Sequence, residues 1–279
     1  MPLTPKETTN LLKRLGHRPK KKLGQNFLID GNIVQKSLDM AELPTHMPVV
    51  EIGPGLGTLT KRLLEAGHTV HAIEIDRCLF ENLKSSLAPF VKNKQLKLTR
   101  ADGVKEPIGS LPENTRDYAV VANLPYAISS PWLEALLATG RLPARMVLML
   151  QREAVDRMWA KHGTKNYNAL SIFLQLSFEN LRSHTVSRQC FFPAPSVDSA
   201  LVRMDRLQSP FLFSQPDRAL IRRIFTQRRK QIGSLAKQEE DDWRRRIETW
   251  LAGNELARTL RPEQIEAGIW KNLAEPKPN

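Results

Sequence analysis

The sequence predicts an α/β fold with a mainly parallel sheet, followed by a small helical domain. Short apolar runs typical of buried strands alternate with helical patterns through residue 205. The stretch 207–217 is rich in residues that break helices and strands, and the segment after it has helical spacing. We therefore expect a basic N-terminal arm (1–22), a larger α/β domain (23–205) and a small helical domain (206–279).

The elements of the α/β domain follow from local patterns. A helix is expected from Leu59 to Leu64, closed by Gly67, and another from Ser130-Pro131 to a stop at Gly140. Five short segments are expected to form strands, at 49–52, 69–73, 96–99, 118–122 and 146–150.

The tetrapeptide 123–126 lies where a buried strand would end in a loop. The amide of Asn123, the Leu124 carbonyl that precedes Pro125 and the ring of Tyr126 could hold a planar nitrogen base by its amino group and its face. Adenine N6 is a poor nucleophile because its lone pair is delocalised, and two acceptors would draw it towards tetrahedral geometry without a general base. The alternative is that these residues only end a strand with a turn.

A second motif has the order strand, glycine loop, helix. Gly53, Gly55 and Gly57 follow the first strand in a G-x-G-x-G pattern, which differs from the G-x-G-x-x-G that binds a dinucleotide. Glu74 follows the next strand, where a ribose-binding carboxylate belongs, and Asp102 follows the third, where it could accept a purine amino group. The set favours S-adenosylmethionine, although each acid taken singly could be a solvated strand end or a turn former.

Five motifs in order resemble the KsgA-type (RsmA) 16S ribosomal RNA adenine N6,N6-dimethyltransferases, over residues 20 to 235. The resemblance implies a Rossmann-like, class I S-adenosylmethionine-dependent methyltransferase fold. The segment 170–178 stays unassigned, because its alternation favours a strand whereas that family has a helix nearby. The motifs are Leu23-Gly24-Gln25-Asn26-Phe27-Leu28, Glu51-Ile52-Gly53-Pro54-Gly55-Leu56-Gly57, Asn123-Leu124-Pro125-Tyr126, the Phe191–Ser199 segment and Phe225-Thr226-Gln227-Arg228-Arg229-Lys230.

The resemblance also implies roles for individual residues. Asn123 and Leu124 would accept from adenine N6, Tyr126 would stack on the base, and Phe191 would cover its other face while Phe192 packs in the core. Two aromatic faces would compensate for the stacking that a flipped-out base loses. The residues implied to close over or hold the cofactor are Asn26, Leu28, Gly53, Gly55, Glu74, Asp102 and Asn123.

The composition indicates a polyanionic partner. The chain has 42 Lys and Arg against 29 Asp and Glu, a net charge of +13, which favours phosphate binding and salt-dependent affinity. Residues 13–22 and 218–237 contain basic residues and no acid, so we expect RNA contacts there, whereas Arg244–Arg246 follow an acidic stretch and are expected to be ordinary solvated surface. On one face of a helix over 218–237, Arg222, Arg229 and Lys230 would meet phosphate, as would Lys20, Lys21 and Lys22 of the arm.

Other classes of function are disfavoured. The sequence has neither an apolar stretch of membrane-spanning length nor the apolar region of a signal peptide near its start, so we expect a cytoplasmic protein. Cys78 and Cys190 have no neighbouring His or Cys cluster, which predicts inert thiols and no metal. We further expect a monomer.

Three functions remain open. The first, implied by the resemblance, is dimethylation of two adjacent adenosines in the 3′-terminal hairpin loop of 16S rRNA, in an immature small ribosomal subunit. The second is methylation of a 23S rRNA adenosine, as in the macrolide-resistance enzymes, although the intact Phe225–Lys230 motif favours the first. The third is a non-catalytic RNA-binding assembly factor, against which the retained Glu74, Asp102, Asn123 and Tyr126 argue.

Overall fold

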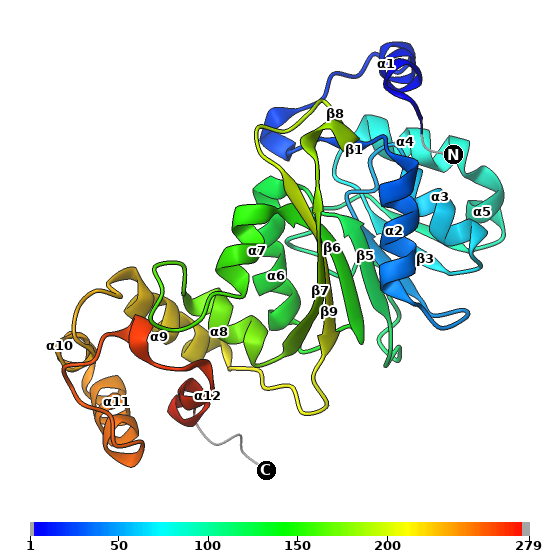
Figure 1. Ribbon diagram of the computed structural model, residues 1–279. Helices are drawn as coiled ribbons and strands as arrows, with labels where there is room; N and C mark the ends of the chain where they lie inside the picture. Colours follow the sequence, from blue (N-terminus) through cyan, green and yellow to red (C-terminus); the bar gives the residue numbers. More distant parts are fainter. Residues whose placement is uncertain (1–2, 275–279) are drawn as a thin grey trace. The chain divides into compact units, whose positions relative to one another are not determined.

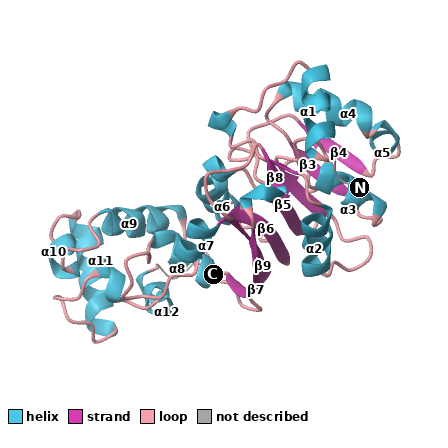
Figure 2. Cartoon of the chain, turned by 45° about the horizontal axis from the view of Figure 1, so that its top comes forward, coloured by secondary structure: helices cyan, strands magenta, loops and turns pink. Residues whose placement is uncertain are grey.

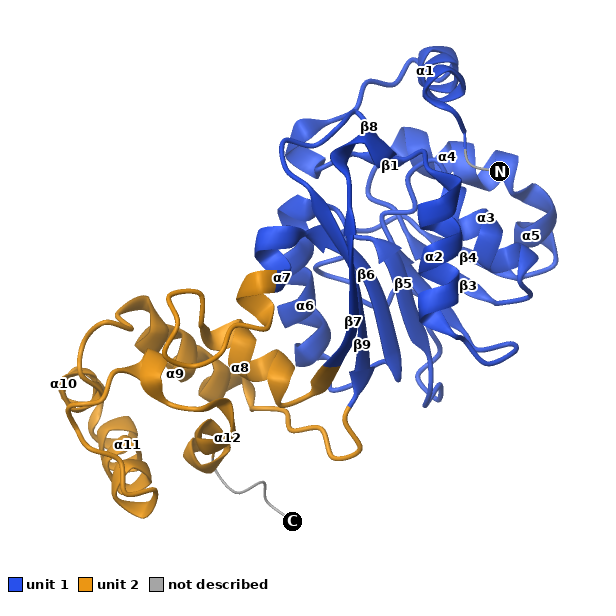
Figure 3. Cartoon of the chain, in the orientation of Figure 1, with its two compact units in different colours: residues 1–155, 180–206 blue, residues 156–179, 207–279 orange. Residues whose placement is uncertain are grey.

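The computed structural model describes residues 3–274, which form two compact units (Figure 3). Unit 1 runs to residue 155 and includes 180–206, and unit 2 holds 156–179 and begins again at 207. The sequence placed 156–179 in the larger domain, but helix α8 of this segment packs against α9 and α12 of the helical unit. The predicted arm and helical domain extend to residues 1–2 and 275–279, which lie outside the described residues.

A seven-stranded sheet organises unit 1, in the order β4-β3-β2-β5-β6-β9-β7 (Figure 1). The strands from β4 to β6 are parallel, and β9 is antiparallel to β6. The five predicted strands are confirmed to within one residue, as is the mainly parallel sheet. The strands are β2 Val49–Ile52, β3 Val70–Ile73, β4 Leu96–Thr99, β5 Ala119–Asn123, β6 Arg145–Gln151, β7 Phe178–Val186 and β9 Ser199–Arg206; β1 Phe27–Leu28 pairs separately with β8 Phe191–Phe192.

Helices lie on both faces of this sheet (Figures 1 and 2). Val49, Val121 and Val147 are buried in one cluster with apolar side chains of α2, α3 and α4, because parallel strands covered on both faces carry apolar residues in succession. The helices are α1 Pro5–Arg14, α2 Gly31–Ala41, α3 Thr58–Glu65, α4 Arg77–Ser86, α5 Ala88–Lys92, α6 Ser129–Ala138 and α7 Arg152–Met158, with 3₁₀ turns η1 Lys21–Leu23, η2 Tyr126–Ile128 and η3 Arg188–Cys190.

The strand order creates a crevice in unit 1. Strand β2 pairs with β3 on one side and β5 on the other, so the chain reverses its direction of travel across the sheet at this pair. The loops after β2 and β5 diverge there, and α/β sheets bind ligands at such a point, outside the carboxyl ends of the strands. The glycine loop and the 123–126 motif follow these two strands.

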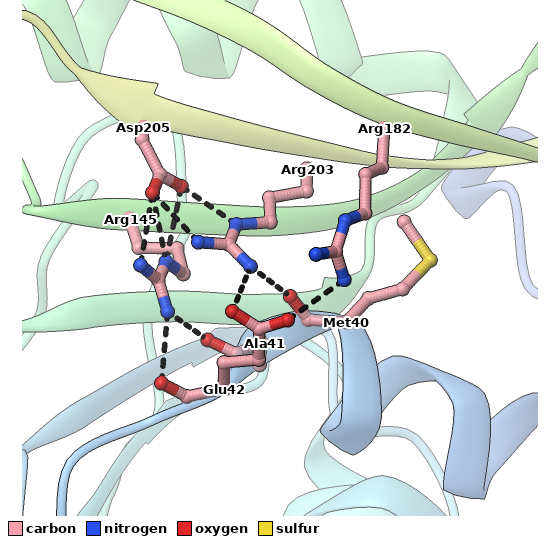
Figure 4. Close-up of polar contacts among 7 residues, drawn as sticks. All are labelled: Met40, Ala41, Glu42, Arg145, Arg182, Arg203 and Asp205. Carbon is pink, nitrogen blue, oxygen red and sulfur yellow. Dashed lines mark hydrogen bonds and ion pairs between the residues drawn. The ribbon is translucent and has the colours of Figure 1, made fainter.

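An ionic network fastens the C-terminal end of α2 to strands β6 and β9 (Figure 4). Asp205 accepts from Arg145 and Arg203, both with Nη2–Oδ2 distances of 2.9 Å. Arg145 also donates to the Ala41 carbonyl at 2.6 Å, and Arg203 forms an ion pair with Glu42. These guanidinium groups donate to backbone carbonyls at the end of α2 that have no hydrogen-bond partner within the helix. Helix α2 follows β1 in the chain.

Unit 2 is helical. The segment 170–178 forms helix α8 and only then enters β7, so the alternation seen in the sequence does not mark a strand there. Residues 169–174 are all buried, and a helix buried on every side shows no amphipathic period. An aromatic chain, Tyr167–Phe225–Trp270–Trp250, packs beside it. The elements are α8 Ala169–Gln175, α9 Gln215–Thr226, α10 Ile232–Ala236, α11 Asp241–Gly253, α12 Ala267–Trp270, η4 Pro262–Gln264 and η5 Lys271–Leu273.

Candidate functional site

A cavity of about 230 Å³ lies at the carboxyl ends of β2, β3 and β5 in unit 1. Its wall is completed by residues 22–28, the segment that leads into β1 and α2. Strand ends and this segment are far apart in the sequence, and only the parallel sheet brings them to one edge. All seven residues predicted to hold the cofactor line the cavity, namely Asn26, Leu28, Gly53, Gly55, Glu74, Asp102 and Asn123.

The glycine loop owes its composition to backbone conformation and packing. Gly53 and Gly55 have φ of 66° and 60°, a region that side chains disfavour. A Cβ on Gly53 would lie 2.8 Å from Cγ of Pro125, and one on Gly55 would lie 3.1 Å from Cδ1 of Phe27. The structure shows that these glycines allow close approach of Pro125 and Phe27, and both glycines also line the cavity, so close approach of a ligand stays a prediction.

The Glu74 carboxylate is hydrogen-bonded to two loops, the glycine loop after β2 and the loop after β3. The carboxylate is 4% exposed, and it accepts from the Gly55 N–H at 3.1 Å and from the Asp76 N–H at 2.9 Å. Burial raises the pKa of Glu74, although the two backbone hydrogen bonds oppose that shift. Each carboxylate oxygen can accept more than one hydrogen bond, so Glu74 can still accept from ligand hydroxyls.

Asp102 serves a local turn and also lines the cavity. Its Oδ1 accepts from the Val104 N–H at 2.9 Å, and its carbonyl accepts from the N–H groups of Lys105 and Glu106. Asp102 is therefore a turn former, and because it also lines the cavity its role as an acceptor for a purine amino group stays a prediction.

The 123–126 motif is held rigidly at the end of β5. Asn123 donates from Nδ2 to the Asn26 carbonyl at 2.9 Å, which leaves Oδ1 as an acceptor. The Tyr126 hydroxyl forms a short hydrogen bond with Oγ of Ser199, and burial raises the pKa of Tyr126. The ring therefore has a fixed orientation and stays protonated at neutral pH.

One assignment at this site needs correction, and another stays a prediction. Leu124 is fully buried and lines neither cavity, but its predicted role belongs to the backbone carbonyl, which burial of the side chain does not contradict. Phe191, predicted to cover the base, is 2% exposed and belongs to the main core, whereas Phe192, predicted to be the core residue, is only partly buried. The β1–β8 pairing accounts for the exchange, since it joins Phe191 to Leu28 in the main core cluster and Phe192 to Phe27 in a smaller cluster.

A second cavity shares part of the wall of the first. The two cavities have Gly24, Gln25 and Asn26 in common. The second is also lined by Tyr126, Gln151 and the segment 193–196, part of the Phe191–Ser199 motif. Tyr126 therefore lines a space that adjoins the first cavity.

Among the residues of the first cavity that the sequence did not indicate, two have distinctive environments. Glu51 is 2% exposed, its Oε2 has no hydrogen-bond partner among residues 3–274, and burial raises its pKa to about 8. A carboxylate inside the apolar run 49–52 was the signal that could have revealed it. Ile75 is 49% exposed beside Glu74 and offers an apolar surface, but a single exposed isoleucine carries no signal in sequence.

The basic residues predicted to bind RNA have different environments. Lys20 forms an ion pair with Asp76, with an Nζ–Oδ2 distance of 2.6 Å, which corrects the view that its charge is available for phosphate. The expected single helix is interrupted at 227–231, so Arg229 and Lys230 lie in a turn. Both are exposed, and neither has a carboxylate partner within the described part of the chain.

The remaining three of these residues are placed as follows. Lys21 lines the second cavity and Lys22 lines the first, and both are exposed. Arg222 on α9 has its guanidinium 5.9 Å from the centre of the Phe173 ring.

Neither a metal centre nor a membrane span is found in the residues that the structure describes. Between residues 3 and 274, no three His, Cys, Asp or Glu side chains group as metal ligands would. Over the same range, no helix combines the length and the apolar character needed to cross a bilayer. Cys78 and Cys190 are free thiols, and burial raises the pKa of Cys190 to about 11.

Comparisons with known proteins agree with this geometry. The ribosomal RNA adenine dimethylase family matches residues 16–266. A relative from Opitutus terrae, named ribosomal RNA small subunit methyltransferase A, is 49% identical over 98% of both chains. A dimethyladenosine transferase from Plasmodium falciparum superposes with a TM-score of 0.69 at 25% identity, over 88% of this chain and 95% of its own. The 23S rRNA methyltransferase ErmE gives 0.61 at 25% identity, over 89% and 98%.

The structural matches share the α/β methyltransferase fold with unit 1, and the family match spans the cavity residues, the 123–126 motif and most of unit 2. The chain therefore belongs to the ribosomal RNA adenine dimethylase family.

Proposed function

We propose that the protein transfers methyl groups from S-adenosylmethionine to N6 of two adjacent adenosines in the 3′-terminal hairpin loop of 16S rRNA. It would act in the cytoplasm, as a monomer, on an immature small ribosomal subunit. The family, and the small-subunit name of a relative 49% identical over 98% of both chains, support this choice.

The first cavity has the donors and acceptors that S-adenosylmethionine requires. Glu74 offers carboxylate oxygens to the ribose diol, and the exposed Ile75 beside it offers an apolar face to the adenine. Asp102 lines the same wall and offers an acceptor to the adenine amino group. When bound, the cofactor supplies an electrophilic methyl group. The residues of the chain position that group and the target amine.

One observation carries the catalytic assignment: Asn123 uses its Nδ2 on the Asn26 carbonyl, so that its Oδ1 is the atom left to accept from N6. An acceptor on the amine hydrogen localises the nitrogen lone pair and directs it along the line of attack. Such a contact strengthens as the amine becomes positively charged, so it lowers the barrier and not only the dissociation constant. No general base is needed before attack.

The second cavity supports the capture of a flipped base. The Tyr126 ring, anchored on Ser199, provides a stacking face worth about 1–3 kcal/mol per base. Exposed Lys21 borders the same cavity, and Arg229 and Lys230 lie exposed in unit 2, where they would bind phosphates. The segment 193–196 also lines this cavity, whereas the predicted stacking residue Phe191 is buried and lines neither cavity.

The test is methylation of defined ribosomal particles. Under-methylated small and large subunits are incubated with labelled S-adenosylmethionine and either wild-type protein or Asn123→Ala, and the rRNA is digested to nucleosides. We expect N6,N6-dimethyladenosine in 16S rRNA with the wild type and little with the variant. Label in 23S rRNA would favour the macrolide-resistance activity, and a protein that binds both substrates without any transfer would be an assembly factor.

A further inference from the structure

Residues 17–28, called here the N-terminal strap, are fastened to one buried carboxylate. The Asp76 side chain is 1% exposed at the N-terminus of α4. It accepts from Nζ of Lys20 at 2.6 Å and from Nε2 of Gln25 at 3.4 Å, and Nδ1 of His17 lies 3.8 Å away. Burial raises the pKa of Asp76, but these partners and its backbone contacts outweigh burial and hold the pKa below its usual range.

The same strap reaches both parts of the proposed reaction site. Its residues 22–28 line the first cavity. Its Asn26 carbonyl accepts from Nδ2 of Asn123, which fixes the orientation of the catalytic amide. The Asp76 N–H donates to Oε1 of Glu74 at 2.9 Å, so the anchor of the strap is tied to the predicted ribose acceptor as well.

The two members of the Lys20–Asp76 pair differ in exposure. The Lys20 side chain is 55% exposed, whereas the carboxylate beneath it is buried. A buried carboxylate without its cation carries a large desolvation cost, so loss of Lys20 disfavours the arrangement in which the strap covers Asp76. The pair can open without exposing apolar core, because the lysine already faces water.

We propose that the Lys20–Asp76 ion pair latches the N-terminal strap over the cofactor cavity, and that both residues are positioning residues for methyl transfer. The proposal rests on the proposed cofactor site. It assigns Lys20 a role in retaining the cofactor and orienting Asn123, in place of a contact with RNA. Opening of the latch would accompany exchange of spent cofactor for fresh cofactor.

Four variants test the latch. Lys20→Met keeps the aliphatic stem without the charge, and Lys20→Arg keeps the charge. Asp76→Asn keeps the helix cap, since Asn and Asp cap N-termini about equally well, while removing the charge. The double variant Lys20→Met/Asp76→Asn reports whether the two act together. Lys21→Met removes the neighbouring charge of the strap as a contrast.

The measurements are stopped-flow release of S-adenosylmethionine, single-turnover methylation and RNA affinity as a function of salt. We expect release to be about tenfold faster in each single charge-removing variant, since hydrogen bonds to charged groups contribute roughly that factor or more. The double variant should be no worse than the singles, Lys20→Arg should be near wild type, and single-turnover rates should fall with release. Lys20→Met should leave the salt slope for RNA unchanged, whereas Lys21→Met should lower it.

The outcomes separate the latch from the cofactor site. A folded Lys20→Met protein with wild-type release and turnover, or with a reduced salt slope, overturns the latch. Asp76→Asn could fail to fold because the carboxylate is buried, but Lys20→Met changes only a half-exposed side chain and decides the question alone. If the wild type itself does not bind S-adenosylmethionine, the proposed cofactor site is wrong, and that result appears before any variant is compared.

Discussion

Replacement of Glu74 by glutamine isolates one charge in the cofactor cavity. The two carboxylate oxygens accept from different backbone donors, the Gly55 N–H at 3.1 Å and the Asp76 N–H at 2.9 Å. A glutamine has one acceptor oxygen and one amino group. Whichever way its amide turns, one of the two N–H groups faces another donor, and the ribose diol loses a charged acceptor.

The magnitude follows from these contacts. A lost hydrogen bond to a charged acceptor costs roughly 1.5–3 kcal/mol, which corresponds to a rise in the dissociation constant of S-adenosylmethionine of about 10- to 100-fold. The buried donor left without an acceptor costs a further ~1–3 kcal/mol, and this part appears in the free energy of unfolding as well. Glu74→Ala should weaken binding at least as much, because both acceptors are lost.

The assay is titration calorimetry of S-adenosylmethionine into each protein, with urea unfolding to measure stability. Glu81→Gln is the matched control, because Glu81 is an exposed glutamate on the adjacent helix α4 and the substitution makes the same change of charge. We expect the control to bind as the wild type does. A folded Glu74→Gln protein with unchanged affinity would refute the assignment of Glu74 to the cofactor.

Four further predictions concern other residues. Asn123→Ala should lower the single-turnover rate by about 10²–10³-fold at saturating substrates, the range found for loss of one electrostatic contact that stabilises a transition state, and a normal rate would contradict the mechanism. Arg229→Gln/Lys230→Gln should weaken RNA binding and reduce the log–log salt slope by about two, without changing cofactor affinity; an unchanged slope would mean that this turn does not contact phosphate. Asp205→Ala, which leaves two guanidinium groups without their shared carboxylate, should lower the free energy of unfolding at pH 7 by roughly 3 kcal/mol. Burial raises the pKa of Asp205, but hydrogen bonds from the two arginines outweigh burial and hold the pKa below its ordinary value. The stabilisation is therefore present above pH 3.8 and is lost at lower pH. If the difference in unfolding free energy between wild type and Asp205→Ala does not shrink in acid, this explanation is contradicted. Burial raises the pKa of Glu51 to about 8 from 4.5, so the unfolding free energy of the wild type should fall as pH rises between these values. Glu51→Gln should flatten this dependence of stability on pH. Parallel dependences in the two proteins would show that Glu51 ionises normally.

Controls for two of these predictions come from the chain itself. Arg244→Gln/Arg245→Gln removes two charges from the same unit, but each arginine already has its own ion pair, with Asp241 and Asp242, so the salt slope should change less. Ser199→Ala removes the anchor of the Tyr126 ring and leaves Asn123 in place, so it should weaken capture of the base more than it slows transfer.

The five strands from β2 to β6 were predictable because each depends on a local signal. Runs such as 118–122 and 146–150 are short and apolar, and a parallel sheet covered on both faces requires that pattern. Helix α8 was not predictable for the opposite reason. Its residues are buried all round, so no periodicity distinguished a helix from a strand.

The residues of the candidate site also differ in whether the sequence could predict their positions. Glu74, Asp102 and Asn123 were expected to lie together because residues that end parallel strands meet at one edge, and all three line the first cavity. Phe191 was assigned by motif, and only the pairing of β1 with β8 determines that its side chain enters the core. Lys20 looked like part of a basic arm, because no local pattern indicates a carboxylate 56 residues away.

The sequence by itself determined the positions of five strands along the chain, the glycine loop, the acids at the strand ends and the excess of positive charge, because these are properties of contiguous residues. Tertiary structure alone decided which charges are paired, which of two adjacent aromatic side chains is buried and which atom of Asn123 is left to accept a hydrogen bond. Those outcomes depend on contacts between distant segments, such as Asn26 with Asn123 and Lys20 with Asp76. The energy of an ionic or hydrogen-bonded contact is set by its partner and its burial, and neither is encoded within a short window of sequence.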